Sequence, residues 1–519
     1  MPPAGWSRTR PAGRDGQPMP LSDRARTLLL VGLGVASALL YLRAFTLRWP
    51  LWLLYAQPHL DYAWLSRYTH EGQAIYLGAF LALFGLQYIA YRLARPLSPS
   101  TRTLVLIVGG QLGFGLLLVG IYPIAALDIY DYLMYGRIVL VYGGNPLAQP
   151  PSAFPDPLVG YSPWPNEPSV YGPIWQLISL VPTALSGGDL LPGLIAFKLT
   201  ALVFYLGCSG VIWRLLLGLR PSLAASGTLL FAWNPLLLFE LAGNAHNDAV
   251  MVLFVLLAAL TLVSGPRPLV LPLLAVAILS KILAAVLLPV FLAGLLLAPG
   301  SRRDRAVWIL GGGAIALGLA VATYAPFWEG TRSLHFLTRG SWFTASFPTM
   351  LREYLRRWLE LEPAGRLAAI LVGAAFATFV VGRLSWCWRT QRPDDDWHAW
   401  LAAAHDVTFG YLAFACLWWE PWYLTWLVGL AALLPSRVLH DRALLFCCGG
   451  VANYVVFKFI WPVYQPMTYT QIMAISAIAI FGPPLLHFAS SLGAPPNEAA
   501  REPLSPAEAP TLRSRVATT

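Results

Sequence analysis

Long apolar runs separated by short polar segments dominate the chain. An α-helix needs about 20 residues to cross the hydrocarbon core of a bilayer, and most of these runs approach that length. The run 268–298 is too long for one span and carries Lys281 near its middle, so we divide it there. The pattern predicts about fourteen transmembrane helices. Their expected positions are 27–45, 74–91, 103–122, 194–217, 223–239, 249–264, 268–280, 282–298, 306–325, 367–388, 400–418, 421–435, 443–460 and 470–488.

The composition agrees with a membrane protein. Hydrophobic residues make up 57% of the 519 residues and charged residues 12%, and the mean hydropathy is +0.60. A soluble globular chain carries about 25% charged residues, so this chain has too few to cover a soluble surface of its size. The predicted fold class is an all-α polytopic membrane protein.

Basic residues set the expected orientation. The net charge of +10 comes mainly from arginines in short segments between apolar runs, which is typical of topology signals and not of a nucleic-acid-binding surface. The positive-inside rule then places the basic segment 1–26 and the tail 489–519, which we expect to be disordered, in the cytoplasm. The membrane domain is 27–488, and its long loops, 123–193 and 326–366, are expected on the extracytoplasmic side of the plasma membrane.

The stretch 127–147 holds the first candidate residues. Asp128 and Asp131 stand at the outer end of a span, and in a helix their three-residue offset puts both carboxylates on one face, beside Tyr132. A carboxylate at a membrane border is costly unless it is solvated or used. The alternative is a solvated cap at the interface. The rest of the loop is rich in proline and aromatic residues, which predicts either a rigid loop that covers a site or a plain interfacial aromatic belt. The stretch 173–186 is expected to be an interfacial helix.

A second polar constellation interrupts the apolar pattern at 233–250. Glu240, His246 and Asp248 lie within nine residues, on the same expected side as Asp128. A polar hairpin turn is the simpler interpretation, although the cluster is denser than a turn requires. His246 and Asp248 supply only two metal ligands, which do not make a site, so a divalent metal is possible but not indicated and no cofactor is expected.

Basic residues outside the membrane suggest binding of an anion. Lys281 within its apolar run either faces a phosphate or snorkels to the interface. Arg332, His335 and Arg339 in the loop 326–366 break the positive-inside trend, which indicates a phosphate-bearing lipid or a solvated amphipathic helix near 348–362. The stretch 418–423 is expected to cap a helical hairpin on the same outer side. Glu420 in it is either another candidate acid or, as we favour, part of an aromatic belt.

Taken in order, these motifs resemble those of the actinobacterial polyprenol-phosphate-mannose-dependent α-1,6-mannosyltransferases, which are GT-C class membrane glycosyltransferases. The resemblance covers roughly 100–465, and each motif alone is weak. Leu147 departs from the family, which usually has a tyrosine after Asn-Pro. The motifs are Asp128, Tyr132, Gly136-Arg137, Gly143, Asn145-Pro146, Tyr171-Gly172-Pro173, Asn234-Pro235, Gly243, His246-Asn247-Asp248, Lys281 and Trp422-Tyr423.

The resemblance implies a GT-C-like bundle in which a polyprenyl-phosphate-linked sugar, expected to be mannose, is the donor and a glycan or glycolipid is the acceptor. It implies that Asp128 is the catalytic base, with Asp131 as the other candidate acid. Lys281, Arg332, Arg339 and His335 are the candidates for the donor phosphate. The candidate substrate-binding residues are Tyr132, Arg137, Asn145, Tyr171, Glu240, His246 and Asp248.

Two other classes stay open at this point. A transporter or flippase of lipid-linked saccharides also has many spans and ionisable residues within the membrane. Another membrane transferase, such as a phosphoglycerol or acyl transferase, is the remaining alternative. Polar residues gathered in one outer cavity favour the glycosyltransferase, whereas a site at the midplane between two related halves favours transport.

Overall fold

The structure is a computed structural model that describes residues 21–390 and 397–492, without the side chains of 338–341 and 492. Within these ranges the chain forms helices and loops and contains no strand. Eight helices are long and apolar enough to cross a membrane. They are α1 with its π-helical end (Asp23–Thr46), α4 (His70–Ala94), α5 (Thr101–Val119), α8 (Leu190–Leu219), α14 with α15 (Arg302–Phe327), α17 (Leu361–Thr390), α20 with α21 (Arg437–Val463) and α22 (Tyr469–Leu492).

The other expected spans are bent or short. α9 (Ala224–Ala232) and α10 (Pro235–Leu238) belong to one apolar pair that bends by 50°. The remaining core helices are α11 (Asp248–Ser264), α12 (Val270–Ser280), α13 (Leu288–Leu297), α18 (His398–Gly410) and α19 (Leu424–Ala431). The chain is therefore an all-α polytopic membrane protein, while the number of about fourteen spans stays a prediction.

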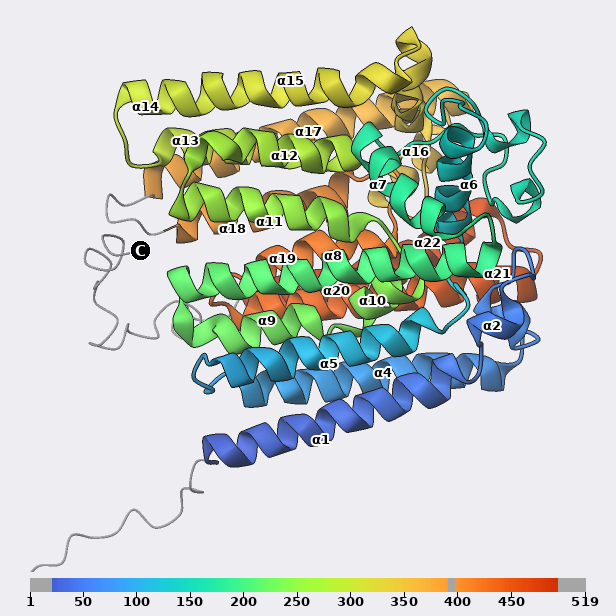
Figure 1. Cartoon of the computed structure of the whole chain (residues 1–519), viewed down its shortest axis with the longest axis horizontal. Coiled ribbons are helices and arrows are strands. Elements are labelled where there is room, and N and C mark those ends of the chain that lie inside the picture. Colours follow the sequence, from blue (N-terminus) through green and yellow to red (C-terminus); the bar gives the residue numbers. More distant parts are fainter. Residues whose placement is uncertain (1–20, 391–396, 493–519) are drawn as a thin grey trace, which may run out of the picture.

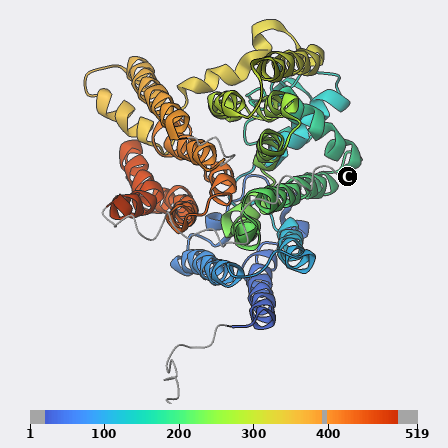
Figure 2. The same cartoon turned by 90° about the vertical axis from the view of Figure 1, so that its left-hand side faces the viewer.

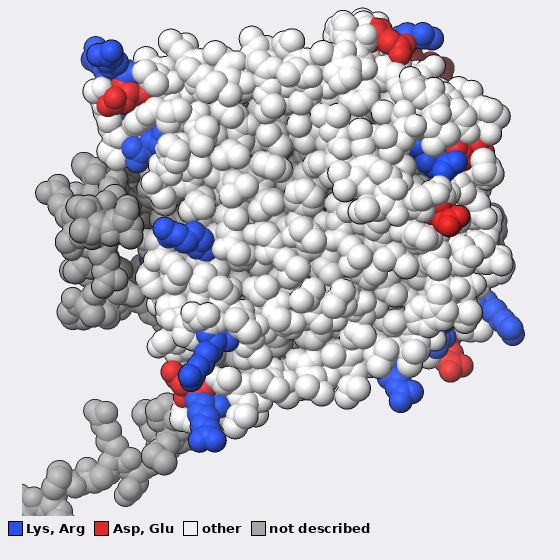
Figure 3. All heavy atoms as spheres, viewed as in Figure 1, with Lys and Arg blue, Asp and Glu red and all other residues white. Residues whose placement is uncertain are grey.

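The long helices run side by side and form one bundle (Figure 1). In the view along the bundle, the N-terminal helices lie at the bottom, the C-terminal helices on the left, and α11 to α15 on the right (Figure 2). Charged side chains gather at the two ends, and the belt between them is almost free of charge on the face shown (Figure 3). A bilayer accommodates such a belt, since charged side chains at its centre are costly.

Short helices gather at one end of the bundle, which we call the loop end. It holds α2 (Leu51–Leu54), α6 (Asp128–Leu140), α7 (Pro173–Leu185) and α16 (Phe347–Leu355), whereas α1 begins at the opposite end (Figure 1). Both long loops therefore lie at one end, and the side of the membrane that this end faces stays a prediction. Most of 1–26 and 489–519 lies outside the described residues.

Three interruptions of regular helix position the candidate site. Asn234 ends the first half of the bent pair and caps α10, because its side chain accepts hydrogen bonds from the backbone N–H groups of Leu236 and Leu237. Ala245 has a φ of 63° in the tight turn before α11. Lys281 is extended between α12 and the next 3₁₀ turn. Irregular backbone at membrane depth is tolerated where it is buried in protein or lines a cavity.

Candidate functional site

Polar residues from separate segments meet near the loop end, and we call five of them the polar cluster. Asp128 is the first residue of α6, Glu240 lies in the π-helical turn Phe239–Gly243, and His246 follows in the tight turn. Asp248 begins α11, and Lys281 follows α12. The two constellations predicted separately, around Asp128 and around His246, thus form one site.

Asp128 ends a chain of tyrosine hydroxyls. The Tyr132 hydroxyl donates to the Tyr171 hydroxyl at 3.3 Å, which in turn donates to Asp128 Oδ1 at 3.3 Å. Burial, followed by the charge of Asp128, raises the pKa of Tyr171 well above its usual value, so this hydroxyl stays a donor. Asp128 Oδ2 lies 4.0 Å from Nδ1 of His246, and the Asp128 side chain is 17% exposed. The carboxylate is therefore oriented from one side and accessible from another.

The motif Tyr171-Gly172-Pro173 holds that tyrosine in place by close backbone packing. The Gly172 N–H donates to the Ser280 carbonyl oxygen at 3.2 Å, directly before Lys281. A Cβ atom on Gly172 would stand 2.0 Å from the Leu279 carbonyl oxygen, so only glycine permits this approach. The contact joins the loop that carries Tyr171 to the segment that carries Lys281.

Glu240 is fully buried and surrounded by donors. The Tyr454 hydroxyl donates to Oε1 at 2.8 Å, and the Asn244 side-chain amide donates to Oε2 at 2.9 Å. His246 Nε2 lies 3.3 Å from Oε2, and its ring stacks on Trp422 with centroids 3.8 Å apart. Glu240 and Trp422 therefore flank the imidazole that lies near Asp128.

Asp248 and Lys281 form an ion pair inside the protein. Lys281 Nζ donates to Asp248 Oδ2 at 2.7 Å, and the indole N–H of Trp426 donates to Oδ1 at 3.1 Å. Nζ also lies 4.8 Å from the ring centre of Tyr423 and 5.7 Å from that of Tyr171. The Lys281 side chain is only 8% exposed, so it does not snorkel to the surface.

The segment 418–426 supplies the aromatic side of the site. Trp422 stacks on His246, Tyr423 lies against Lys281, and Trp426 donates to Asp248. All three of these aromatic residues are buried. Trp422 and Tyr423, which were expected in an interfacial belt, thus face the polar cluster, and Trp426 lies beside them.

Glu420 stands in this segment, just before the 3₁₀ turn Pro421–Tyr423, and is partly buried. Burial raises its pKa to about 8, and the neighbouring carboxylates of Asp128 and Glu240 add to the shift. Lys458 and Lys281 act in the opposite direction with smaller effect. The raised pKa favours the protonated form of Glu420 at neutral pH.

Asp131 and Arg137 lie on the same helix as Asp128 but have other partners. Asp131 is buried and accepts a hydrogen bond from the hydroxyl of Ser162. The Arg137 guanidinium pairs with Asp156 at 2.8 Å. These contacts tie α6 to its own loop, and the structure does not bring either residue into the polar cluster.

Asn145 connects the two long loops. Its side-chain amide donates to the Phe327 carbonyl oxygen at 2.7 Å and to Glu329 Oε1 at 2.9 Å. His335 Nε2 makes a second connection with Glu167 at 3.0 Å. Asn145 therefore closes the loop region and lies apart from the polar cluster.

The other basic candidates lie near the surface or outside the described part of the chain. Arg332 is 3.8 Å from Glu329, and its side chain is 76% exposed. The Arg339 side chain falls outside the described residues. The assignment of Arg332, Arg339 and His335 to a donor phosphate therefore stays a prediction.

Sequence reasoning missed Tyr454 and undervalued Glu420. Tyr454 lies in α20, and its only signal is the neighbouring Asn453 in an otherwise apolar stretch. Glu420 was masked by the tryptophans around it, which are equally typical of a membrane interface. The signal in the sequence that could have identified Glu420 was an acidic residue at a helix end on the same expected side of the membrane as Asp128.

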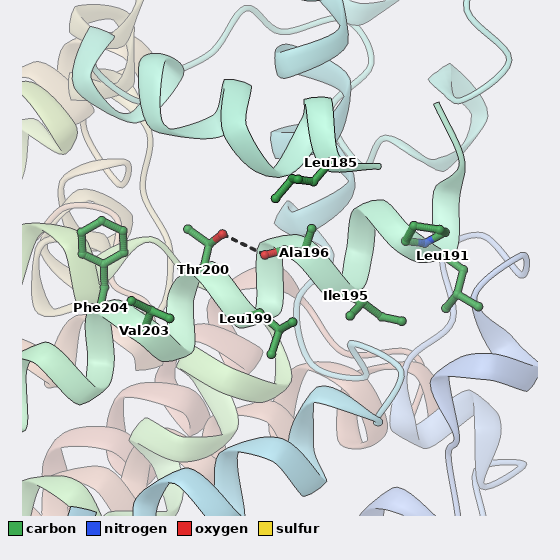
Figure 4. Close-up of a pocket in the computed structure, with 9 residues that line it drawn as sticks. Leu185, Leu191, Ile195, Ala196, Leu199, Thr200, Val203 and Phe204 are labelled. Atoms are coloured by element: carbon green, nitrogen blue, oxygen red, sulfur yellow. Dashed lines mark hydrogen bonds between the residues drawn. The ribbon is translucent and has the colours of Figure 1, made fainter. Parts of the chain in front are cut away.

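A metal centre and an apolar cavity are two other candidate sites for chemistry. No three His, Cys, Asp or Glu side chains in the described ranges are grouped to hold a metal ion, and the expectation of a metal-free reaction stays a prediction. An open cavity of about 560 Å³ lies on α8 beside the end of α7 (Figure 4). Its lining is almost entirely apolar, for example Leu185, Ile195 and Val203, so it does not support acid–base chemistry.

Comparison with known proteins places these residues in a family. The family model described as "Alpha-(1->6)-mannopyranosyltransferase, N-terminal domain" matches residues 30–298, which include the whole polar cluster and end before the segment 418–426. No solved structure matches the chain.

Three relatives are similar over part of their length. The chain is 26% identical to Alpha-(1->6)-mannopyranosyltransferase A of Mycobacterium tuberculosis over 382 residues, which is 65% of this chain and 66% of the relative. It is 27% identical to the A enzyme of Corynebacterium glutamicum over 32% of this chain and 34% of the relative. It is 29% identical to Alpha-(1->6)-mannopyranosyltransferase B of the same organism, over 26% of this chain and 23% of the relative. The matches thus span less than two thirds of each relative's length. The family model, in contrast, covers just over half of this chain, and the chain therefore belongs to the alpha-(1->6)-mannopyranosyltransferase family.

Proposed function

We propose that this protein transfers mannose from a polyprenyl-phosphate-linked donor to a glycan or glycolipid acceptor, with inversion, on the extracytoplasmic face of the plasma membrane. The observation that carries the proposal is the position of Asp128 near the loop end. Its accessible carboxylate accepts a hydrogen bond from Tyr171 and lies 4.0 Å from His246, in a chain that belongs to this family. A donor whose chain lies in the bilayer requires a site near the membrane border.

In this mechanism Asp128 is the general base. It takes the proton of the acceptor hydroxyl while that oxygen forms a bond to the anomeric carbon of mannose. The bond from the anomeric carbon to the donor phosphate oxygen breaks, and its electron pair goes to the phosphate. The transition state resembles an oxocarbenium ion, as in glycoside hydrolysis, and a single displacement inverts the anomeric configuration.

The leaving phosphate gains negative charge and needs hydrogen-bond donors. Lys281 is the cation nearest to Tyr171 and Tyr423 in the polar cluster and still has N–H groups beyond the one donated to Asp248. We assign it to the donor phosphate, with the basic residues of the loop 326–366 as further candidates. Gathering of the polar residues toward one end supports transfer over transport.

Purified protein tests this proposal directly. Incubation with a panel of polyprenyl-phosphate sugars and a short α-1,6-linked mannooligosaccharide should release polyprenyl phosphate with the mannose donor. The product linkage should have the opposite anomeric configuration to the donor, which NMR measures. Release with none of the sugars, or retention of configuration, would contradict the proposal.

A further inference from the structure

Lys198 is a buried lysine that the proposed mechanism does not use. It lies in α8 and is 0% exposed. Its ammonium group donates hydrogen bonds to the backbone carbonyl oxygens of Ile121 and Gly243. No carboxylate in the described part of the chain forms an ion pair with it, whereas Lys281 and Lys458 each face an aspartate. Because a charged side chain inside a membrane domain is costly, Lys198 is a candidate for a functional role.

Both carbonyl groups stand at the ends of interrupted helices. Ile121 lies just beyond α5, and Gly243 is the last residue of the π-helical turn Phe239–Gly243. The last carbonyl groups of a helix have no partner within the helix and carry its negative partial charge. An ammonium group between two such ends is therefore stabilised without a carboxylate. Broken helices in membrane transporters use their carbonyl ends in a similar way to coordinate a sodium ion.

The two helix ends lead directly to the candidate site. Asp128 follows seven residues after Ile121, and His246 follows three residues after Gly243. The ends are themselves in contact, since a Cβ atom on Gly243 would lie 3.6 Å from Cγ2 of Ile121. Lys198 thus joins the backbone segments that carry Asp128 and His246, whose side chains approach each other to 4.0 Å.

We propose that Lys198 is a positioning residue for sugar transfer, whose ammonium group joins the two helix ends and so fixes the separation between Asp128 and His246. This inference rests on the proposed function, in which Asp128 is the base. Lys198 does not touch the substrate in this role, and no proton or covalent bond changes at its Nζ. A compact ammonium group suits the task because it has three donors at one atom and its hydrogen bonds are charge-assisted.

Lys198→Met tests this role in the full-length protein, because methionine has nearly the same length but neither charge nor donor. The loss of alignment should lower kcat for mannose transfer by about 10–10²-fold, since small displacements of a reacting group have effects of this size. The affinity for the donor should stay nearly the same, because its phosphate is assigned to Lys281. Lys458→Met, at a lysine whose side chain is 37% exposed, is the matched control and should behave as wild type.

A double variant with Asp128→Asn separates positioning from general damage to the fold. If Lys198 acts through Asp128, Lys198→Met should hardly lower the residual turnover of Asp128→Asn, because no base is left to align. Damage to the fold would instead lower turnover by the same factor with and without Asp128. An equal loss in both backgrounds, or a normal kcat in Lys198→Met, would overturn the proposal.

Lys198→Gln takes the place of Lys198→Met if the methionine variant does not fold. Its amide still donates two hydrogen bonds but is shorter and uncharged, so kcat should fall by a smaller factor, and this loss should again disappear in the Asp128→Asn background. In that case a loss that persists in Asp128→Asn, or no loss at all, would overturn the proposal. Wild type that releases no polyprenyl phosphate from the mannose donor would instead refute the proposed function.

Discussion

Lys281 Nζ lies 2.7 Å from Asp248 Oδ2, and both side chains are almost completely removed from solvent. This pair makes Lys281 at once a structural residue and a candidate for the donor phosphate. Removal of one partner from a buried ion pair leaves an uncompensated charge and typically costs about 3–5 kcal/mol. Variants at both positions separate the two roles.

Lys281→Met should therefore lower the unfolding temperature clearly, whereas Lys281→Met combined with Asp248→Asn should recover most of the loss. Thermal unfolding in detergent measures both. If Lys281 also binds the donor phosphate, the stable double variant should still have turnover reduced by about 10²-fold or more. Full recovery of turnover in the double variant would restrict Lys281 to a structural role.

Gly172 offers a test of how Tyr171 is positioned. In Gly172→Ala the added methyl group would meet the Leu279 carbonyl oxygen, so Tyr171 should be displaced from Asp128 and turnover should fall at least tenfold. Gly160→Ala, in the same loop and with open space around the glycine, is the control and should behave as wild type. Equal turnover of the two variants would show that this loop does not position the base.

The overall class followed from the sequence because transmembrane helices are set by local hydrophobicity and length. Apolar runs and arginine positions were sufficient to predict an all-α polytopic protein and to place Asp128 and His246 on one side. The pairing of Lys281 with Asp248 was not predictable in this way, since 33 residues separate them and helix packing alone brings them together.

The two candidate acids of α6 show a different limit. Asp128 and Asp131 are three residues apart on one helix, which by spacing alone makes them equivalent. They differ because Tyr171 donates a hydrogen bond to Asp128, whereas Ser162 donates one to Asp131. Glu420 was undervalued for a similar reason: its aromatic neighbours favour a membrane interface, and only the fold turns the segment 418–426 inward.

The expected orientation is testable with single cysteines in a variant that lacks the five native ones. Asn166→Cys and Arg332→Cys are at exposed positions of the two long loops and should react with an impermeant thiol reagent in intact cells. Ser301→Cys, exposed at the opposite end just before α14, should react only after lysis. The reverse pattern would place the loop end in the cytoplasm.

The central claim, that Asp128 is the base of sugar transfer, is tested most directly by turnover at saturating donor in Asp128→Asn and Asp131→Asn. General-base assistance typically contributes about 10²–10⁴-fold. Asp128→Asn should lose turnover by that factor while it still folds and binds donor, because the amide keeps the shape but does not accept the proton. Asp131→Asn, whose residue faces Ser162, should lose far less. Near-normal turnover in Asp128→Asn with collapse in Asp131→Asn would move the base to Asp131, and normal turnover in both would contradict the account.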